Sequence, residues 1–352
     1  MHNVIRYHIA YQKTNLMKTI MGVFTKIQSD DLAAFLSEAY ALGDFFRMAG
    51  IQTGSQNTNY WLRTSEGEFV FTLFERNYNL KTIDQICNLS GHLKEQGVKI
   101  PSLVKTKEDE FIGYFNGKPS VITRFIHGYT LSPRNITEKH CTLAGKELAT
   151  LHNASQSFKM PITGFYNKKQ WPHILEIIDA NIDNLEAPHK QQYQELKNDF
   201  LTIHNEWPKD KEHFNIHGDL FPDNVLFIDD LLTGVIDFNF ADFENPTYDL
   251  AILLLSWSFD DNNDFNIERF ISAAKSYAQH SPFWQLDYYK DIRFYLKAAA
   301  LRFVLSRFYD MALNNVAEGK TALDPTIMIN RYIFMKKNSD SIVSRLLQEL
   351  SL

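Results

Sequence analysis

The chain has 352 residues, of which 44% are hydrophobic and 22% are charged, and its formal net charge is −6. This length and composition can support one or two hydrophobic cores, which excludes disorder over most of the chain. The negative charge disfavours nucleic acid as the main partner, because neutralising phosphates requires a basic surface. Two cysteines, Cys87 and Cys141, are too few for a disulfide framework and indicate thiols in a reducing compartment.

Export and membrane insertion are not indicated by any segment. The best candidate for a membrane span, 250–257, is too short to cross a bilayer and is typical of a buried helix. Residues 1–20 contain neither a sustained apolar stretch nor a small-residue cleavage site, so a secretory signal is not expected. We therefore expect a cytoplasmic protein without membrane contact. Residues 1–20 are expected to form a disordered extension or, alternatively, to precede the start codon that is used, at Met21.

The first third of the chain has the pattern of a β-rich unit that contains helices. Residues 29–36 combine a capping sequence with apolar positions at helical spacing. The β-forming stretches 60–64 and 69–74 flank a tight turn, which predicts a hairpin. Helical spacing returns at 80–96, and further strands are predicted at 101–105, 110–115 and 119–126.

The remainder is predicted to be mainly helical. Apolar residues recur at helical spacing in seven segments: 143–152, 173–186, 190–205, 247–258, 266–280, 286–315 and 325–350. A short hydrophobic strand at 232–238 and the loop before it interrupt this pattern. We therefore predict an α+β fold with two lobes. A small antiparallel β N-lobe would comprise 21–127, and a larger, mainly helical C-lobe would comprise 128–352.

The strongest functional signal is the stretch His-Gly-Asp-Leu-Phe-Pro-Asp-Asn at 217–224, with Ile-Asp-Phe at 236–238. Asp219, Asn224 and Asp237 have the order and spacing of the protein-kinase catalytic loop and its metal-binding Asp. Phosphoryl transfer requires a carboxylate that orients and deprotonates a hydroxyl, and oxygen ligands for magnesium. The motif thus predicts a protein-kinase-like fold with Asp219 as the catalytic, substrate-contacting base. Asn224 and Asp237 are the predicted ligands of Mg²⁺.

Three nearby residues are expected to have structural roles and not catalytic ones. His217 is expected to fix the loop by hydrogen bonding, and Asp249 is expected to brace it. Asp223, beside Pro222, is expected to be a solvated turn residue. Any single Asp in this stretch, taken alone, could likewise be an ordinary turn residue without a catalytic role. The shared spacing of the motif, rather than any one residue, favours the functional interpretation.

Segments of the predicted N-lobe are expected to contact ATP. The turn-rich stretch 50–59 precedes the first hairpin, where kinases place a loop that binds phosphates through backbone amides. Gly and Asn at these positions would equally suit an ordinary hairpin or Asx turn. The hinge near 124–128 is expected to contact adenine. The predicted ATP-binding residues are Gly54, Ser55, Asn57, Thr72, Arg124, Phe125 and Ile126.

One feature of the kinase pattern is missing from the second strand. Thr72 stands where kinases usually carry a Lys or Arg that holds the α- and β-phosphates. The phosphate charge would then be neutralised by magnesium, by backbone amides or by a nearby basic residue such as Arg76. Arg76 could equally be a solvent-exposed residue at the end of the strand. The acid that would pair with the missing cation is not evident either, since Asp84 and Glu95 are both candidates.

Several stretches outside the catalytic loop share a further pattern. They are 21–36, 50–62, Phe-Thr-Leu-Phe-Glu at 71–75, the run from 236 to 257, and Ala-Leu-Arg-Phe-Val-Leu-Ser-Arg-Phe-Tyr-Asp at 300–310. Over roughly 21–340 the chain resembles bacterial homoserine kinases of the aminoglycoside phosphotransferase-like type. In that family Thr-Leu-Tyr/Phe-Glu is usual, so the resemblance implies that Thr72 is compatible with activity. Residues 1–20 and 242–244 depart from the family pattern.

The resemblance implies ATP-dependent phosphorylation of the side-chain hydroxyl of L-homoserine, giving O-phospho-L-homoserine for threonine biosynthesis. A free amino acid needs a cation for its carboxylate and an acid for its ammonium group. Arg302 is the predicted carboxylate ligand, and Glu244, or alternatively Asp242, is the predicted acid. Arg307 has an ion-pair option three residues away at Asp310, whereas Arg302 has no acid at neighbouring positions of its helix.

Two alternatives stay open at this point. The acceptor could be another small alcohol, such as choline, methylthioribose or an aminoglycoside, because many relatives share the catalytic loop. The chain could also be a non-catalytic nucleotide-binding pseudokinase, which the missing Lys favours and the intact Asp219, Asn224 and Asp237 disfavour. The expected partners are ATP and L-homoserine, the expected cofactor is Mg²⁺, and no obligate protein partner is inferred.

Overall fold

The structure is a computed structural model that describes residues 25–51, 57–75, 79–209, 212–281, 286–314 and 322–350. The predicted extension 1–20 lies outside these ranges, as do Gly54, Ser55 and Arg76. The chain divides into two compact units, which are described separately. Of the described residues, the first contains those up to Glu75 and Val104–Phe125, and the second contains Asn79–Leu103 and those from Ile126 onwards.

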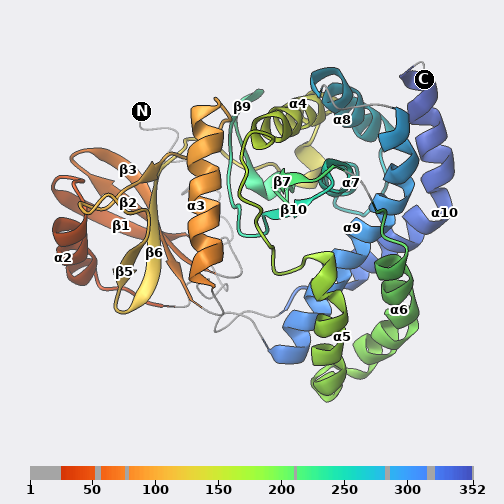
Figure 1. Cartoon of the computed structure of the whole chain (residues 1–352), viewed down its shortest axis with the longest axis horizontal. Helices are drawn as coiled ribbons and strands as arrows, with labels where there is room; N and C mark the ends of the chain where they lie inside the picture. The colour runs from red at the N-terminus through yellow and green to blue at the C-terminus, as the bar shows by residue number, and fades with distance from the viewer. Residues whose placement is uncertain are drawn as a thin grey trace. The chain divides into compact units, whose positions relative to one another are not determined.

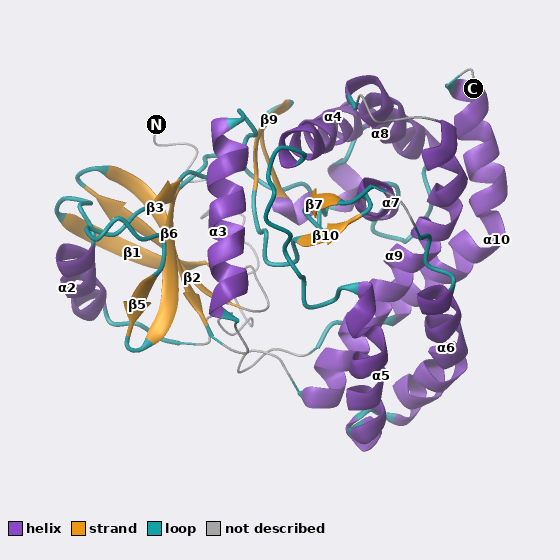
Figure 2. Ribbon diagram, in the orientation of Figure 1, coloured by secondary structure: helices purple, strands orange, loops and turns teal. Residues whose placement is uncertain are grey.

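The first unit is built around a largely antiparallel sheet, with the strand order β1-β2-β3-β6-β4 and β5 paired with β6 (Figure 2). Strands β2 (Asn57–Thr64) and β3 (Gly67–Phe74) form the predicted hairpin, in which Thr64 pairs with Gly67 and Asn57 with Phe74. The other strands are β1 (Phe45–Ile51), β4 (Leu103–Val104), β5 (Gly113–Phe115) and β6 (Lys118–Arg124).

The core of the first unit lies on the face of the sheet that helix α2 (Ser29–Ala39) covers. Leu32 and Leu36 of α2 belong to the same buried cluster as Phe69 and Phe71 of β3. Strand β1 is a difference from the sequence-based expectation, which begins the strands of this unit at residue 60. Its exposure does not alternate along the chain, so β1 lacks the period-2 pattern that identifies a half-buried strand.

The second unit is mainly helical. Its helices are α3 (Leu80–Glu95), α4 (Glu138–Ser155), α5 (Trp171–Ala180), α6 (Ala187–Asn205), α7 (Pro246–Trp257), α8 (Ile267–His280), α9 (Leu286–Leu313) and α10 (Thr326–Glu349). Helix α4 lies beside α8, and both α7 and α10 lie beside α9 (Figure 1). Helix α3, which falls within the predicted N-lobe, groups with this unit.

Four short strands interrupt the helices of the second unit. They form two antiparallel pairs: β7 (Phe214–Ile216) with β10 (Asp242–Glu244), and β8 (Val225–Ile228) with β9 (Leu231–Val235). Strand β9 ends at Val235, earlier than the predicted strand 232–238, so Asp237 lies in the loop that follows it. The backbone of Asp237 has φ +68°, a left-handed conformation that is incompatible with an extended strand at this residue.

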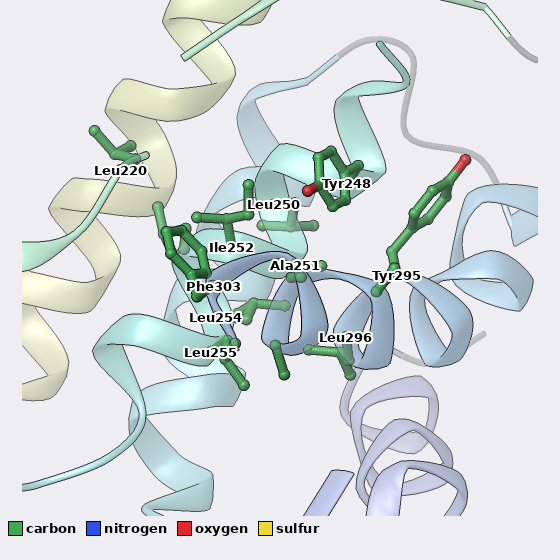
Figure 3. Close-up of a cluster of buried hydrophobic side chains, with 14 of the residues drawn as sticks. Leu220, Tyr248, Leu250, Ala251, Ile252, Leu254, Leu255, Tyr295, Leu296 and Phe303 are labelled. Carbon is green, nitrogen blue, oxygen red and sulfur yellow. The ribbon is translucent and has the colours of Figure 1, made fainter. Parts of the chain in front are cut away.

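Helix α7 forms the centre of the larger core. Every residue from Pro246 to Trp257 is buried, as expected for a helix in which apolar residues predominate. Figure 3 shows Leu250 and Ile252 of α7 grouped with Leu296 and Phe303 of α9. The predicted buried helix at 250–257 is therefore confirmed. Within the described ranges, no helix combines the length and the hydropathy of a membrane span.

Candidate active site

The predicted catalytic loop begins where β7 ends and closes in a short 3₁₀ turn, Pro222–Asn224. The β8–β9 hairpin then returns the chain to the loop, because the backbone amide of Ile236 donates to the carbonyl of Asn224 at 3.0 Å. The pairing of β7 with β10 brings a second segment to the same place, with Ile216 opposite Asp242. Local folding alone thus brings the residues around 219, 224 and 237 together.

Asp249, in the first turn of α7, holds the loop by its backbone. Its two carboxylate oxygens accept hydrogen bonds from the amides of His217 at 2.8 Å and Gly218 at 2.9 Å. His152 Nε2 donates to the same carboxylate at 3.0 Å, and both side chains are fully buried. Burial alone would raise the pKa of Asp249, but the hydrogen bond and charge of His152 outweigh it and the pKa is lowered. This is the geometry that the predicted bracing role requires.

His217 links the loop to the segment before Asp237. Its Nε2 bonds the carbonyl of Ile236 at 3.0 Å, so this nitrogen carries the proton, and its Nδ1 accepts from the amide of Asp219 at 3.2 Å. Burial lowers the pKa of His217, in agreement with a neutral ring. Gly218 between them has φ +74°, and a Cβ there would lie 2.2 Å from the carbonyl oxygen of Phe240. Only glycine fits this position without rearrangement.

Asn224 is hydrogen bonded to Asp219, and the charge of Asp237 lies near enough to act on Asp219. Asn224 Nδ2 donates to the backbone carbonyl of Asp219 at 2.8 Å and to its Oδ2 at 3.1 Å. Burial raises the pKa of Asp219 well above its usual range, the charge of Arg302 opposes this, and the nearby charge of Asp237 adds to it. A carboxyl group with a raised pKa is a better proton acceptor than an ordinary surface Asp.

The oxygens of Asn224 and Asp237 fit a hard cation. Because Asn224 Nδ2 is committed to Asp219, its Oδ1 is left for a ligand. Desolvation raises the pKa of Asp237 even though the residue keeps contact with solvent, and a cation would favour its charged form. Within the described parts of the chain, no group of three or more His, Cys, Asp or Glu could hold a metal. A cation here would therefore take further ligands from phosphates and water.

Arg302 of α9 lies beside Asp219. Its Nη1 is 3.7 Å from Asp219 Oδ1, and the side chain is only 4% exposed. The guanidinium lies over the rings of Phe303 at 4.2 Å and Phe240 at 4.5 Å, and over a third ring, Tyr166, at 5.0 Å. Arg302 has no acidic partner on its own helix, and its acidic neighbour is Asp219 of the catalytic loop. This places the predicted carboxylate ligand next to the predicted base.

A small cavity lies between Arg302 and Asp242. Its volume is about 10 Å³, which is room for about one water-sized group. It is lined by Gly164, Tyr166, Asn167, Ile216, Gly218, Phe240, Asp242, Tyr248 and Arg302. Gly164 and Asn167 precede α5, and no sequence pattern around them indicates a site.

Glu244 is not brought to this cavity. Its side chain is 2% exposed and pairs with Lys168 Nζ at 3.1 Å and His213 Nε2 at 3.0 Å. Burial would raise the pKa of Glu244, but the hydrogen bond from His213 and other contacts lower it. Asp242, two residues earlier and about 6–7 Å away along β10, lines the cavity instead. Of the two acids weighed for the ammonium group, the structure therefore places only Asp242 near Arg302.

The described ATP-binding candidates lie in both units. Asn57 begins β2 and is buried, and Thr72 Oγ1 donates to Asn59 Oδ1 at 2.7 Å. Arg124, the last residue of β6, has its guanidinium 5.2 Å from the ring of Phe69. Phe125 belongs to the first unit and Ile126 to the second. No geometry around these residues tests contact with a nucleotide, so their role stays a prediction.

Comparison with known proteins shows the family. Residues 47–283 match the model of the phosphotransferase enzyme family. The homoserine kinase of Parvibaculum lavamentivorans is 33% identical over 291 residues, which cover 83% of this chain and 88% of the relative. The homoserine kinase of Rhizobium rhizogenes is 32% identical over 321 residues, which cover 91% of this chain and 98% of the relative.

Solved structures show the same fold at low sequence identity. A spectinomycin phosphotransferase in complex with ADP and spectinomycin has a TM-score of 0.61 and 15% identity, covering 92% of this chain and 100% of that one. An amicoumacin kinase in complex with AMP-PNP and Ca²⁺ has a TM-score of 0.64 and 12% identity, covering 90% and 94%. The predicted α+β, protein-kinase-like fold is confirmed. The chain belongs to the phosphotransferase enzyme family and, within it, to the homoserine kinases.

Proposed function

We propose that this protein is an ATP-dependent kinase that phosphorylates the side-chain hydroxyl of L-homoserine. The product is O-phospho-L-homoserine, a precursor in threonine biosynthesis, and we place the reaction in the cytoplasm. The observation that carries the proposal is the convergence of Asp219, Asn224 and Arg302 in a chain related to homoserine kinases over most of its length. The lobe boundaries 21–127 and 128–352 stay part of this proposal.

Asp219 is the proposed catalytic base. Its carboxylate would orient the hydroxyl of homoserine for in-line attack on the γ-phosphorus of ATP and accept the hydroxyl proton. The bond from the hydroxyl oxygen to phosphorus forms as the bond to the β–γ bridging oxygen breaks, and ADP leaves. The side chain of Asp219 is 16% exposed, so the base is held by protein and still reachable by a substrate. Its hydrogen bond from Asn224 fixes the carboxylate for this task.

Asn224 and Asp237 are the proposed ligands of Mg²⁺. These two residues would hold the ion beside the catalytic loop, where it would supply positive charge against the phosphates of ATP. The amide of Asn224 contributes a neutral oxygen and Asp237 a charged one, which is a ligand set suited to this ion. The candidates Gly54, Ser55, Asn57, Thr72 and 124–126 stay proposed contacts of ATP.

Arg302 is the proposed ligand of the substrate carboxylate. Its guanidinium has one long contact to Asp219, and aromatic rings hold it in place, so the fork remains suited to a bidentate anion. A carboxylate bound there would keep the amino acid within reach of Asp219. The same positive charge favours the ionised form of Asp219, which the base needs before it accepts a proton.

Substitution of Asp219 by Asn tests the proposal. With ATP, Mg²⁺ and L-homoserine, we expect kcat to fall by roughly 10³-fold, which is within the range for loss of a general base, while ATP binding persists. Asp223→Asn is the matched control, because Asp223 is an exposed acid in the adjoining turn. Unchanged turnover in Asp219→Asn would remove this residue from the mechanism.

The acceptor is tested with the wild-type protein. L-Homoserine is compared with choline, methylthioribose and an aminoglycoside in a coupled ADP-release assay. We expect the highest kcat/KM for L-homoserine. A higher value for another alcohol would reassign the substrate. A protein that binds ATP and turns over none of these alcohols would instead be a non-catalytic nucleotide-binding protein.

A further inference from the structure

Helix α7 contacts the catalytic loop at a second point, besides Asp249. The indole Nε1 of Trp257, the last residue of α7, donates a hydrogen bond to the backbone carbonyl of Leu220 at 2.9 Å. Trp257 and Leu220 are both fully buried. Ser256 Oγ is 3.4 Å from the same carbonyl but lies closer to the carbonyl of Ile252, at 2.9 Å. Among the described residues, Trp257 is therefore the main donor to Leu220.

The two contacts of α7 lie on either side of the proposed base. Asp249, in the first turn of the helix, accepts hydrogen bonds from the two loop amides that precede Asp219. Trp257 donates to the carbonyl of the residue that follows it. The helical rise from residue 249 to residue 257 is about 12 Å, so opposite ends of α7 bind the loop at separate places. A backbone that is held on both sides of Asp219 has little freedom to move its carboxylate.

Burial of a tryptophan does not by itself require a hydrogen bond of this kind. Trp207, which follows α6, is also buried, and its Nε1 has no hydrogen-bond partner among the described residues. A buried backbone carbonyl, in contrast, needs a donor. The carbonyl of Leu220 receives its donor from the same helix that holds the amides before the base. The position of this indole N–H therefore bears on the loop and not only on the packing of the core.

We propose that Trp257 is a positioning residue for phosphoryl transfer, because its indole N–H holds the carbonyl of Leu220 and thereby fixes Asp219 against the substrate hydroxyl. This inference rests on the proposed role of Asp219 as the base. Trp257 is fully buried and acts through the loop. A displacement of a reacting group by about 1 Å can lower turnover by about 100-fold. Because the indole hydrogen bond is neutral and Asp249 still holds the preceding amides, its loss alone should lower kcat by about 10-fold.

The test substitutes Trp257 by Phe, which keeps a buried aromatic ring and removes the N–H. Steady-state kinetics are measured with ATP, Mg²⁺ and L-homoserine at a temperature well below the Tm of the variant. We expect kcat to fall by about 10-fold, while KM for ATP and for L-homoserine changes by less than about twofold. A purely structural role would lower Tm and leave kcat of the folded protein unchanged. That result would overturn the proposal.

Trp207→Phe is the matched control. It removes the same part of a buried indole ring, but no hydrogen bond is lost among the described residues. We expect Tm to fall and kcat to stay at the wild-type value. If Trp207→Phe lowered kcat as much as Trp257→Phe, the loss would follow from ring volume, and the proposal would be wrong.

A second replacement separates the N–H from the size of the ring. In 3-benzothienylalanine a sulfur atom takes the place of the indole N–H, and the bicyclic ring keeps its dimensions. Incorporated at position 257, it should lower kcat by about 10-fold, as Trp257→Phe does. It also serves as the test if Trp257→Phe cannot be purified folded. Wild-type kcat with this replacement would show that the hydrogen bond does not position the base.

A double variant tests whether the two contacts of α7 act on one loop. Once Asp249→Asn has released the loop, loss of the second contact should add little. Asp249→Asn combined with Trp257→Phe should therefore lower kcat little more than Asp249→Asn alone. A combined loss equal to the product of the two single losses would mean that the contacts act independently, which would contradict the proposal.

The same measurements separate this inference from the proposed function. An active wild type with unchanged kcat in both Trp257 replacements would contradict only the role of Trp257. A wild type that phosphorylates another alcohol instead of L-homoserine would contradict the proposed function, and the same variants assayed with that alcohol would still test Trp257. A wild type that phosphorylates no alcohol would overturn both.

Discussion

The hydrogen bonds from the catalytic loop to Asp249 predict how far substitution of this residue lowers the stability of the protein. In Asp249→Asn, one carboxylate oxygen becomes an amide nitrogen, which cannot accept a hydrogen bond. The amide of either His217 or Gly218 then loses its acceptor in a fully buried site. Losing a charge-assisted bond and leaving a buried donor unpaired costs about 3 kcal/mol. For a protein of this length, that corresponds to a fall in Tm of about 4 °C.

The same substitution should affect turnover more than substrate binding. If the loop that carries the proposed base, Asp219, shifts by about 1 Å, kcat is expected to fall by about 100-fold, with little change in KM. Steady-state kinetics with ATP and L-homoserine, together with thermal unfolding, measure both effects.

Asp260→Asn is the matched control for Asp249→Asn. Asp260 also accepts two backbone amides, those of Asn262 and Asp264 at 2.9 Å each, but in an exposed turn. We expect kcat to stay unchanged in this variant. A variant Asp249→Asn with a lowered Tm and wild-type kcat would show that the contact stabilises the fold without positioning the base. If both Tm and kcat were unchanged in Asp249→Asn, the hydrogen bonds to Asp249 would contribute neither to stability nor to turnover.

Two further predictions concern Gly218 and Asp242. Gly218→Ala should lower both Tm and kcat strongly, because its Cβ would lie 2.2 Å from a backbone oxygen. Gly117→Ala is the control: Gly117 also has a positive φ, +78°, but faces open space, so the substitution should lower the free energy of unfolding by only about 1 kcal/mol. Equal losses in the two variants would contradict the argument. The folded-state pKa of Asp242, about 6, is above its usual 3.8, so the native state binds more protons between these pH values and loses stability as the pH rises. Between pH 4 and pH 7, the free energy of unfolding of Asp242→Asn should therefore rise by up to about 3 kcal/mol relative to that of wild type, measured by urea unfolding without ligand. If the stabilities of the two proteins changed with pH in parallel, the raised pKa would be excluded.

The sequence predicted those parts of the site that fold locally. Asp219 and Asn224 lie on one loop, and Asp237 follows the hairpin that returns the chain to this loop, so their spacing along the chain already implies their proximity. The resemblance in the late helix also selected Arg302, which lies beside Asp219 although many residues separate them. Strand β1 was missed, because its exposure does not alternate and a periodic signal is therefore absent.

The choice between two acids on β10 could not be made from the sequence. Asp242 and Glu244 are both buried on the same short strand, and only the register with β7 decides which of them lies next to the catalytic loop. The partners that settle the matter, Gly164 and Lys168, lie far away in the chain. Pairing across such distances depends on tertiary packing, and no local pattern records it.

The burial of helix α7 on every side has a consequence for how turnover responds to mutation. Since Asp249 projects from its first turn to the loop amides, the position of the proposed base, Asp219, depends on the packing of Leu250, Ile252 and their neighbours (Figure 3). Release of the loop would require opening of a helix that is buried along its whole length, which is a rare event. Substitutions that touch neither substrate, but loosen this packing, would therefore reduce the rate of phosphorylation before they visibly unfold the molecule.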